Sequence, residues 1–297
     1  MNILSFEKQV SAIAALCEGN SIRATERLVG AHRDTIMRLG VRIGQGCARL
    51  HNALMHDLQP QVVELDELWA YVGKKQARVE LGEVQEKGDQ YTFLALDATN
   101  KAILSFYTGK RNAQSTRFFV SDLRQRVINS PQITSDGFPH YVPAITAIFG
   151  PQVDYAMLVK NYRVVQGNQA QIRYSPGAIV SVSRQVVAGR PDERRISTSY
   201  VERTNLTVRM SQRRFTRLTN GFSKKLENHQ AAVALFVAHY NFCRVHEALR
   251  ITPAMALGVS DHIWSVAELI MNATAEVESY SPYRKDGPFR VIDGGRD

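Results

Sequence analysis

The sequence predicts an α/β fold in which a mixed five-stranded sheet is flanked by helices, with further helices before and after it. Two observations lead to this prediction. The spacing of hydrophobic residues changes from helical to strand-like near residue 61, and it returns to helical from Ser199. Between these points the expected order is strand, strand, strand, helix, strand, helix, strand. This order is typical of a mixed sheet covered by helices.

The first 50 residues are expected to form three helices. Gly19 and Asn20 end the first, Ser21 can cap the second, and a turn at Gly30 leads to a third over 32–43. Two short helices joined by a glycine-containing turn are the signature of a helix-turn-helix, although such hairpins also occur in proteins that never contact DNA. In a helix-turn-helix the N-terminal residues of the later helix enter the major groove. The candidate DNA-contacting residues here are His32, Arg33, Thr35 and Arg38.

A connector over 51–60 leads into the strand-rich region. Gly and Pro residues then interrupt the pattern over 160–197, which is expected to be an irregular basic insertion that can include a small hairpin. Helical spacing dominates from Ser199 to about Tyr240, and Pro253 and Trp264 begin two short helical pieces. The expected strands are 62–71, 91–97, 102–108, 133–136 and 153–159, and the expected helices between them are 112–127 and 141–149. The predicted organisation is a helix-turn-helix domain (1–50), a linker (51–60), a sheet domain (61–245) and C-terminal helical pieces with a tail (246–297).

The composition excludes several classes of protein. No apolar run reaches the roughly 18 residues that a membrane-spanning helix needs, and the N-terminus has no signal-peptide pattern. The three cysteines are far apart in the sequence and form neither a zinc pattern nor a disulfide framework. A reducing cytoplasm is therefore the expected location.

The net charge of +9 is unevenly distributed along the 297 residues. The segment 160–225 holds 14 Lys or Arg residues and three acids, so it carries +11 while the rest of the chain sums to −2. A field of one sign favours a polyanionic partner such as nucleic acid, the alternative being a solvated basic surface.

Three carboxylates are the candidate catalytic and metal-binding residues. Asp66 and Asp136 each follow an apolar, strand-like run, and Glu202 opens a helix-like run. Taken singly, each of the three reads as a surface acid. Together they can meet at one edge of a sheet, where carboxylate oxygens suit Mg²⁺. Two such ions are a known device for phosphodiester chemistry. Glu67 follows Asp66 directly and is expected on the opposite face of the strand, so it is not predicted as a ligand.

Basic residues near these acids are candidate DNA contacts. Lys74 and Lys75 are expected on a loop after the first strand. Arg209, Arg213 and Arg217 recur every four residues and would form one stripe on a helix, for which a solvated face is the alternative. The remaining candidates are Arg203 and Arg214.

Three longer phrases around these acids resemble one known family. They are Asp66-Glu67-Leu68-Trp69-Ala70-Tyr71-Val72-Gly73-Lys74-Lys75, Ser135-Asp136-Gly137-Phe138-Pro139-His140-Tyr141 and Tyr200-Val201-Glu202-Arg203-Thr204-Asn205-Leu206-Thr207-Val208-Arg209. Each is similar to one acidic motif of the bacterial DDE transposases of the insertion-sequence-one kind, within the RNase H-like and retroviral-integrase superfamily. The less specific phrase His239-Tyr240-Asn241-Phe242-Cys243-Arg244-Val245-His246, with Thr252-Pro253, recurs in several groups of such transposases.

The resemblance implies an RNase H-like fold and a transposase activity. Two Mg²⁺ or Mn²⁺ ions would lie between Asp66, Asp136 and Glu202, and hydrolysis at an element end would expose a 3′-hydroxyl that attacks target DNA. It also implies double-stranded DNA as partner, an assembly of at least two copies, and a bacterial or archaeal cytoplasm with association to the nucleoid. The chain departs from relatives in lacking a four-cysteine zinc element, and in having Thr204 where they often carry His.

Two other functions remain open at this stage. One is a DNA-binding regulator whose sheet domain is catalytically inactive, although all three acids are present. The other is an RNase H-like nuclease that cuts DNA without joining it, for which the N-terminal hairpin would have no evident use.

Overall fold

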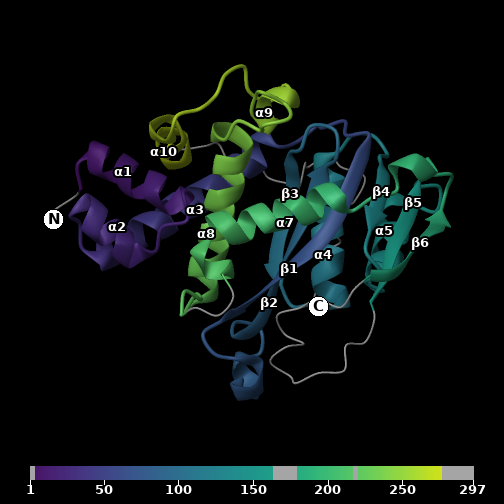
Figure 1. The fold of residues 1–297 in the computed structure, drawn as a ribbon, viewed down its shortest axis with the longest axis horizontal. Helices are drawn as coiled ribbons and strands as arrows, with labels where there is room; N and C mark the ends of the chain where they lie inside the picture. Colours follow the sequence, from purple (N-terminus) through teal and green to yellow (C-terminus); the bar gives the residue numbers. More distant parts are fainter. Residues whose placement is uncertain (1–3, 163–178, 217–219, 276–297) are drawn as a thin grey trace, which may run out of the picture.

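The computed structural model describes residues 4–162, 179–216 and 220–275. Its centre is a mixed sheet in the order β3-β2-β1-β4-β5-β6 (Figure 1). β1 runs parallel to β4, and β4 runs parallel to β5, whereas the other neighbours are antiparallel. The strands are β1 (Val62–Val72), β2 (Gly88–Asp97), β3 (Ile103–Gly109), β4 (Gln132–Ser135), β5 (Tyr155–Tyr162) and β6 (Ile179–Ala188). The predicted α/β class with a mixed sheet is confirmed, and the arrangement is consistent with an RNase H-like fold.

The predicted number of five strands is wrong, because the sheet has six. The additional strand, β6, lies in the segment expected to be an irregular insertion, and it pairs antiparallel with β5 as the outer strand of a hairpin. Its Val and Ile side chains, including Val180 and Val182, are exposed. Since β6 buries little apolar surface, the brief alternation of Val180, Ser181, Val182 and Ser183 marks no buried face.

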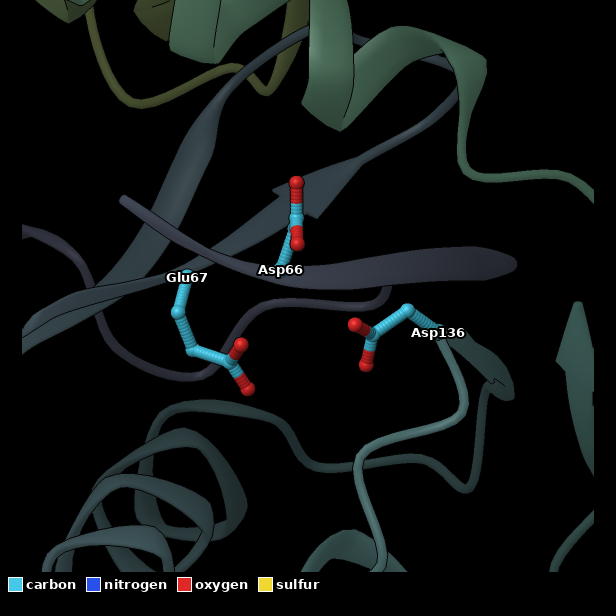
Figure 2. A group of neighbouring side chains, drawn as sticks. All are labelled: Asp66, Glu67 and Asp136. Atoms are coloured by element: carbon cyan, nitrogen blue, oxygen red, sulfur yellow. The ribbon is translucent and has the colours of Figure 1, made fainter. Parts of the chain in front are cut away.

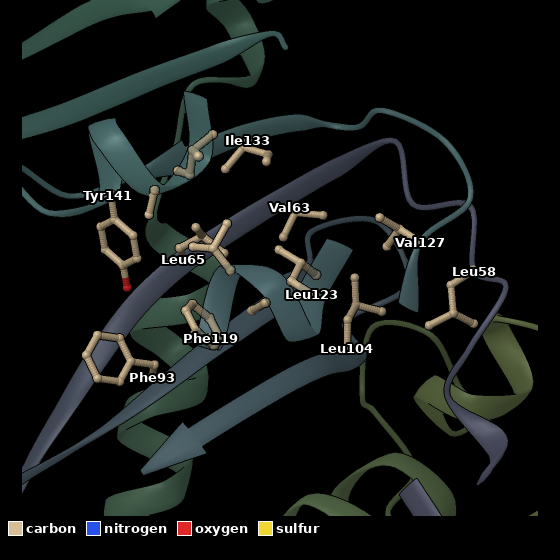
Figure 3. Close-up of a cluster of buried hydrophobic side chains, with 14 of the residues drawn as sticks. Leu58, Val63, Leu65, Phe93, Leu104, Phe119, Leu123, Val127, Ile133 and Tyr141 are labelled. Carbon is tan, nitrogen blue, oxygen red and sulfur yellow. The ribbon is translucent and has the colours of Figure 1, made fainter. Parts of the chain in front are cut away.

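Helices cover both faces of the sheet. The core on one face joins Val63 and Leu65 of β1 to α4 (Ala113–Arg126) and α5 (Tyr141–Phe149), as Figure 3 shows. On the other face, Leu68 and Ala70 of β1 pack with α7 (Ser199–Ser211) and α8 (Leu226–Ala238). Odd-numbered residues of β1 therefore face α4 and α5, and even-numbered residues face α7 and α8.

The N-terminal region consists of α1 (Phe6–Cys17), α2 (Ile22–Val29) and α3 (Arg33–Leu54). The Ser21 hydroxyl caps α2 by accepting the Ala24 N–H at 3.1 Å, and Gly30 ends that helix with a φ of 66°. The third helix is longer than the predicted 32–43 and runs into the expected linker, so only the last part of 51–60 is non-helical. Its continuation is stabilised by packing, because Cys47 and Leu50 are buried in a core shared with α8.

Two glycines bring α3 very close to its neighbours. A Cβ atom added at Gly44 would overlap the Ala231 carbonyl of α8, and one added at Gly46 would overlap the Ala273 carbonyl of α10 (Val266–Thr274). The N-terminal helices are thus packed directly on the helices that cover the sheet (Figure 1).

The expected helical stretch from Ser199 to Tyr240 is interrupted. α7 ends at Ser211, a 3₁₀ turn buries Phe215, and α8 begins only at Leu226. α8 continues into a π-helical turn (His239–Cys243), and α9 (Pro253–Ala256) and α10 follow near the predicted positions. None of the helices within the described residues is both long and apolar enough to span a membrane. The described 3₁₀ helices are Gln76–Arg78, Leu81–Glu83, Glu193–Arg195 and Arg213–Phe215.

The π-helical turn explains one phrase of the sequence. The buried Asn241 side chain accepts the Ile103 N–H at 3.0 Å and donates to the Ile103 carbonyl at 2.9 Å. Asn241 thereby pairs the backbone of the outer strand β3 as a neighbouring strand would, which satisfies two buried polar groups.

Candidate functional site

Two of the three predicted carboxylates meet at one edge of the sheet. The last register pair of β1 and β4 is Leu65 with Ser135, so Asp66 and Asp136 each come directly after this paired stretch. Asp136 follows the end of β4, whereas Asp66 lies within β1, which continues to Val72. They form a group with Glu67 in which one carboxylate oxygen from each residue lies within 4.8 Å of the others. Figure 2 shows Asp66 and Glu67 on opposite sides of β1 and Asp136 beside them.

Glu67 was not predicted as a ligand, but the structure brings its carboxylate into this group. The prediction that it lies on the opposite face of β1 from Asp66 is correct. Its carboxylate nevertheless lies close to that of Asp136, because the longer glutamate side chain reaches the end of β4. Only 3% of the Glu67 side chain is exposed.

The three carboxyl groups repel one another in a poorly solvated place. Burial raises the pKa of Asp66 to about 7, and the charges of Asp136 and Glu202 add to that rise. Burial and the Asp136 charge likewise raise the pKa of Glu67 to about 7, against the opposing effect of Arg111. The pKa of Asp136 is also raised, mainly by burial. A bound cation would relieve this repulsion.

Arg111 provides positive charge on the Glu67 side of the group. Its guanidinium lies 3.2 Å from Glu67 Oε2 and 3.8 Å from Asp136 Oδ2, and it packs over the Phe138 ring at 4.0 Å. It directly precedes Asn112, which caps α4, so the start of this helix positions it. Nothing in the local sequence marks Arg111 as part of the site, because its partners come from β1 and β4.

The third predicted carboxylate, Glu202, lies outside the close group. It is in the first turn of α7, where it forms an ion pair with Lys160 of β5 and accepts a hydrogen bond from Thr198 Oγ1 at 2.6 Å. Its charge nevertheless contributes to the raised pKa of both Asp66 and Asp136. α7 therefore brings a third carboxylate near the two aspartates, with Lys160 as its present counter-ion.

Two residues that the sequence did not single out connect α7 to β1. The buried Asn205 donates from Nδ2 to Asp66 Oδ2 at 2.7 Å, and its Oδ1 has no hydrogen-bond partner among the described residues. Glu64, only 1% exposed, accepts the Val201 N–H at 2.8 Å. Asn205 is one turn beyond Glu202 on the same helix, a spacing that could have identified it.

The predicted DNA contacts in the N-terminal helices lie on the surface. His32 is the N-cap of α3, where its Nδ1 accepts the Asp34 N–H at 3.3 Å, and Arg33 and Arg38 are exposed beside it. Thr35 is half-buried between them.

The other predicted basic residues differ in whether they form ion pairs within the chain. Lys74 forms ion pairs with Glu83 and Glu80, so its charge is already neutralised within the chain. Lys75 and Arg203 are exposed, and Arg209 lies near the end of α7.

The predicted helical stripe of arginines is wrong, because α7 ends at Ser211. Arg213 and Arg214 instead lie in a 3₁₀ turn, and Arg217 lies outside the described residues. Arg214 is half-buried and donates to Ser223 Oγ at 2.8 Å. The burial of Phe215 and Gln212 draws the chain away from the helix axis.

The residues at the sheet edge suit a hard divalent cation. All the donors are oxygens, the three closest are carboxylates, and the unpaired Asn205 Oδ1 lies next to one of them. Mg²⁺ and Mn²⁺ prefer such a donor set, whereas no described histidine or cysteine belongs to the group.

Comparisons with known proteins add little to these observations. No protein-family model and no curated protein matches the chain. Among solved structures, it is similar to a cryo-EM structure of a piggyBac transposase synaptic complex with hairpin DNA. The two are 11% identical, the match covers 92% of this chain and 72% of that chain, and the TM-score is 0.38.

Proposed function

We propose that this chain is a DNA transposase of the DDE kind, which cleaves the ends of a mobile element and joins them to target DNA. The observation that carries the proposal is the meeting of Asp66, which lies within β1 just beyond its pairing with β4, and Asp136, which follows the end of β4. A further carboxylate from α7 is close enough to raise the pKa of both aspartates. The net charge of +9 and the motif resemblance to the insertion-sequence-one kind support a DNA substrate.

Asp66, Asp136 and Glu202 are proposed to hold two Mg²⁺ or Mn²⁺ ions, and Glu67 is close enough to supply a further oxygen. Bound ions of this kind activate an attacking oxygen and stabilise the departing one. No covalent protein–DNA intermediate is needed, so no serine or tyrosine nucleophile is required.

The surrounding residues have positioning roles in this proposal. Asn205 fixes the rotamer of Asp66 through its hydrogen bond, and Glu64 anchors the start of α7 so that Glu202 faces the sheet edge. Lys160 holds the Glu202 carboxylate, and Arg111 balances the charge of Glu67 and Asp136. A ligand that loses a hydrogen-bonded support, as Asp66 would without Asn205, typically binds metal 10- to 100-fold less tightly.

Recognition of the element ends is assigned to the first three helices. His32, Arg33, Thr35 and Arg38 would contact the major groove as a helix-turn-helix does, and Lys75 and Arg203 would contact phosphates nearer the sheet edge. An enzyme that joins two DNA ends usually works as a multimer, so we expect at least a dimer. A nucleoid-associated location in a bacterial or archaeal cytoplasm follows from the same activity.

The test uses a supercoiled plasmid that carries the gene with its flanking DNA. We expect the wild-type protein to nick it with Mg²⁺ but not with EDTA, and to join a precut end to a second plasmid. Asp136→Asn should abolish both reactions and retain DNA binding. Metal-dependent nicking without joining would favour a nuclease, and specific binding without any cleavage would favour a regulator.

A further inference from the structure

A row of three aromatic rings leads away from the carboxylate group. Trp69 and Tyr71 follow Glu67 at intervals of two residues on β1, so all three side chains share one face of the strand. The ring centroids of Trp69 and Tyr71 are 6.0 Å apart, and those of Tyr71 and Phe222 are 4.5 Å apart. All three rings are half-exposed. We call Trp69, Tyr71 and Phe222 the aromatic row.

Backbone pairing fixes the last ring of the row. The Gly73 N–H donates to the Ser223 carbonyl at 2.8 Å, and Val72 forms a parallel bridge with Ser223. β4 pairs with β1 only as far as Leu65, so the same edge of β1 is available farther along the strand, where Ser223 pairs with it. The position of Phe222 beside Tyr71 is therefore set by main-chain hydrogen bonds as well as by ring packing.

The row ends at a basic cleft. Lys224 lies over the Phe222 ring at 3.7 Å, and both residues line a cleft of about 830 Å³ between α2, α3, α8 and the segment that precedes α8. The described lining residues include no carboxylate. Its cationic residues are Arg23, Arg213, Arg214 and Lys224, and within the described part of the chain none of them forms an ion pair.

We infer that the aromatic row and the basic cleft bind an unpaired stretch of a DNA strand, with its bases against the rings and its phosphates toward the cations. Half-exposed rings followed by cations without a described acidic partner suit a single strand, because every base offers a flat face for stacking. A duplex backbone would use the cations alone, since its bases are stacked on one another.

The position of the aromatic row beside the carboxylate group suggests what strand binding is for, and this step rests on the proposed function. The row begins two residues from Glu67, so an unpaired strand lying along it would start at the carboxylate group and lead away from it. Opening of the duplex next to a cut would supply such a strand. The row would then hold a strand end in place while the neighbouring phosphodiester reacts.

Intrinsic fluorescence can test the row without disturbing it. The chain has two tryptophans, and Trp264 is stacked on Phe242 at 4.6 Å, outside the aromatic row. Trp264→Phe therefore leaves Trp69 as the sole reporter. With EDTA present to prevent cleavage, we expect a 15-nucleotide oligo-dT to quench Trp69 fluorescence saturably. In Trp69→Phe, the remaining Trp264 signal should not change. An unchanged Trp69 signal at saturating oligo-dT would overturn the inference.

Ring substitutions then separate stacking from charge. Phe222→Leu keeps the apolar volume but removes the ring, and should weaken binding of fluorescein-labelled oligo-dT about tenfold, with duplex binding changed less than twofold. Phe222→Tyr should restore the affinity, and melting curves of both variants check folding. Equal losses for both DNA forms, or no loss for either, would contradict stacking.

The same experiments distinguish this inference from the proposed function. Quenching of Trp69 by oligo-dT without any metal-dependent nicking would retain the aromatic row as a strand site and refute the transposase. Nicking and joining that are unaffected by Phe222→Leu, together with an unquenched Trp69, would retain the transposase and refute the row.

Discussion

The two faces of β1 contribute carboxylates to the same site in different ways. On the α7 face, Asp66 is held by a neutral amide from Asn205, and its charge has no basic partner among the described ion pairs. On the α4 and α5 face, Glu67 is held by the Arg111 guanidinium, which Asp136 shares. Asp66 therefore has no positive charge paired with it among the described ion pairs, whereas Glu67 is already paired with Arg111.

This difference predicts separate roles for the two acids. A carboxylate without a fixed counter-ion gains most from a bound metal, because a nearby positive charge favours its ionised form. A carboxylate paired with arginine is partly neutralised, and it acts more through the shape and charge balance of the site. The four predictions below test the contrast, from the largest expected effect to the smallest.

The first prediction compares Asp66→Asn with Glu67→Gln. We expect Asp66→Asn to lower Mg²⁺-dependent cleavage at least 10³-fold, because it removes a ligand that no other residue on that face replaces. Glu67→Gln should lower it only 10- to 100-fold, as expected for a supporting ligand. Glu247→Gln, an exposed acid on the loop after α8, is the matched control in the nicking assay. Equal losses of cleavage in Asp66→Asn and Glu67→Gln would show that the two acids do not have separate roles.

The second prediction concerns the amide that holds Asp66. Asn205→Ala should lower cleavage 10- to 100-fold and raise the metal concentration needed for half-maximal rate, because Asp66 would lose its fixed orientation. Substrate DNA binding, measured by fluorescence anisotropy with EDTA, should stay within twofold. Asn205→Asp supplies the conservative comparison, since it adds an oxygen but loses the N–H donor. Normal metal dependence in Asn205→Ala would assign Asn205 to packing alone.

The third prediction follows from the pKa of Asp66, which is about 7 in the folded protein against 3.8 ordinarily. Between pH 4 and 7 the unfolded chain releases a proton that the folded chain retains, so the free energy of unfolding falls as the pH rises. Asp66→Asn removes this effect, and we expect it to raise stability at pH 8 by about 1–3 kcal/mol without metal.

Thermal melts of both proteins at pH 4.5 and pH 8, with EDTA, measure this effect. The gain should be small at the lower pH, where Asp66 is protonated in the folded protein. A variant less stable than the wild type at pH 8 would show that the ionised carboxylate stabilises the fold.

The fourth prediction concerns Arg111, the positively charged residue paired with Glu67. Arg111→Gln removes a positive charge that competes with a metal for Glu67 and Asp136. We expect Mn²⁺ affinity at pH 8 to rise about three- to tenfold by isothermal titration, the size of a partly exposed charge interaction. Arg117→Gln, an exposed arginine on α4, is the control. Weaker Mn²⁺ binding in Arg111→Gln would mean that Arg111 organises the carboxylates instead of competing for them.

Much of the site was predictable because its parts are short-range. Asp66 and Asp136 each follow a buried apolar run, and these two runs pair in parallel, so the residue after each run lies at the same level of the sheet. Local patterns therefore sufficed to bring the two aspartates together. The contributions of Asn205, Arg111 and Glu64 depend on how α7 and α4 cross the sheet. That information lies in tertiary packing. Only Asn205, one turn beyond Glu202, has a local spacing that points to it.

The errors in the fold have similar causes. Helical spacing continues past Ser211 in the sequence, but burial of Phe215 ends the helix there, and the arginine stripe disappears with it. α3 extends beyond its predicted end because Cys47 and Leu50 are buried against other helices. β6 was anticipated only as part of a small hairpin that the basic insertion could include, because most of its side chains are exposed and nearby Gly and Pro residues interrupt the pattern. In each case, long-range burial or its absence outweighs local propensity.

The close approach of Gly44 to α8 and of Gly46 to α10 would fix the distance along the DNA between the bound sequence and the cleaved bond. No flexible tether separates the first three helices from the sheet, so the number of base pairs between a recognised sequence and the scissile bond would be constant. Cleavage at one invariant offset from the bound site is expected, and a bulkier residue at Gly44 should broaden that offset before it slows the reaction.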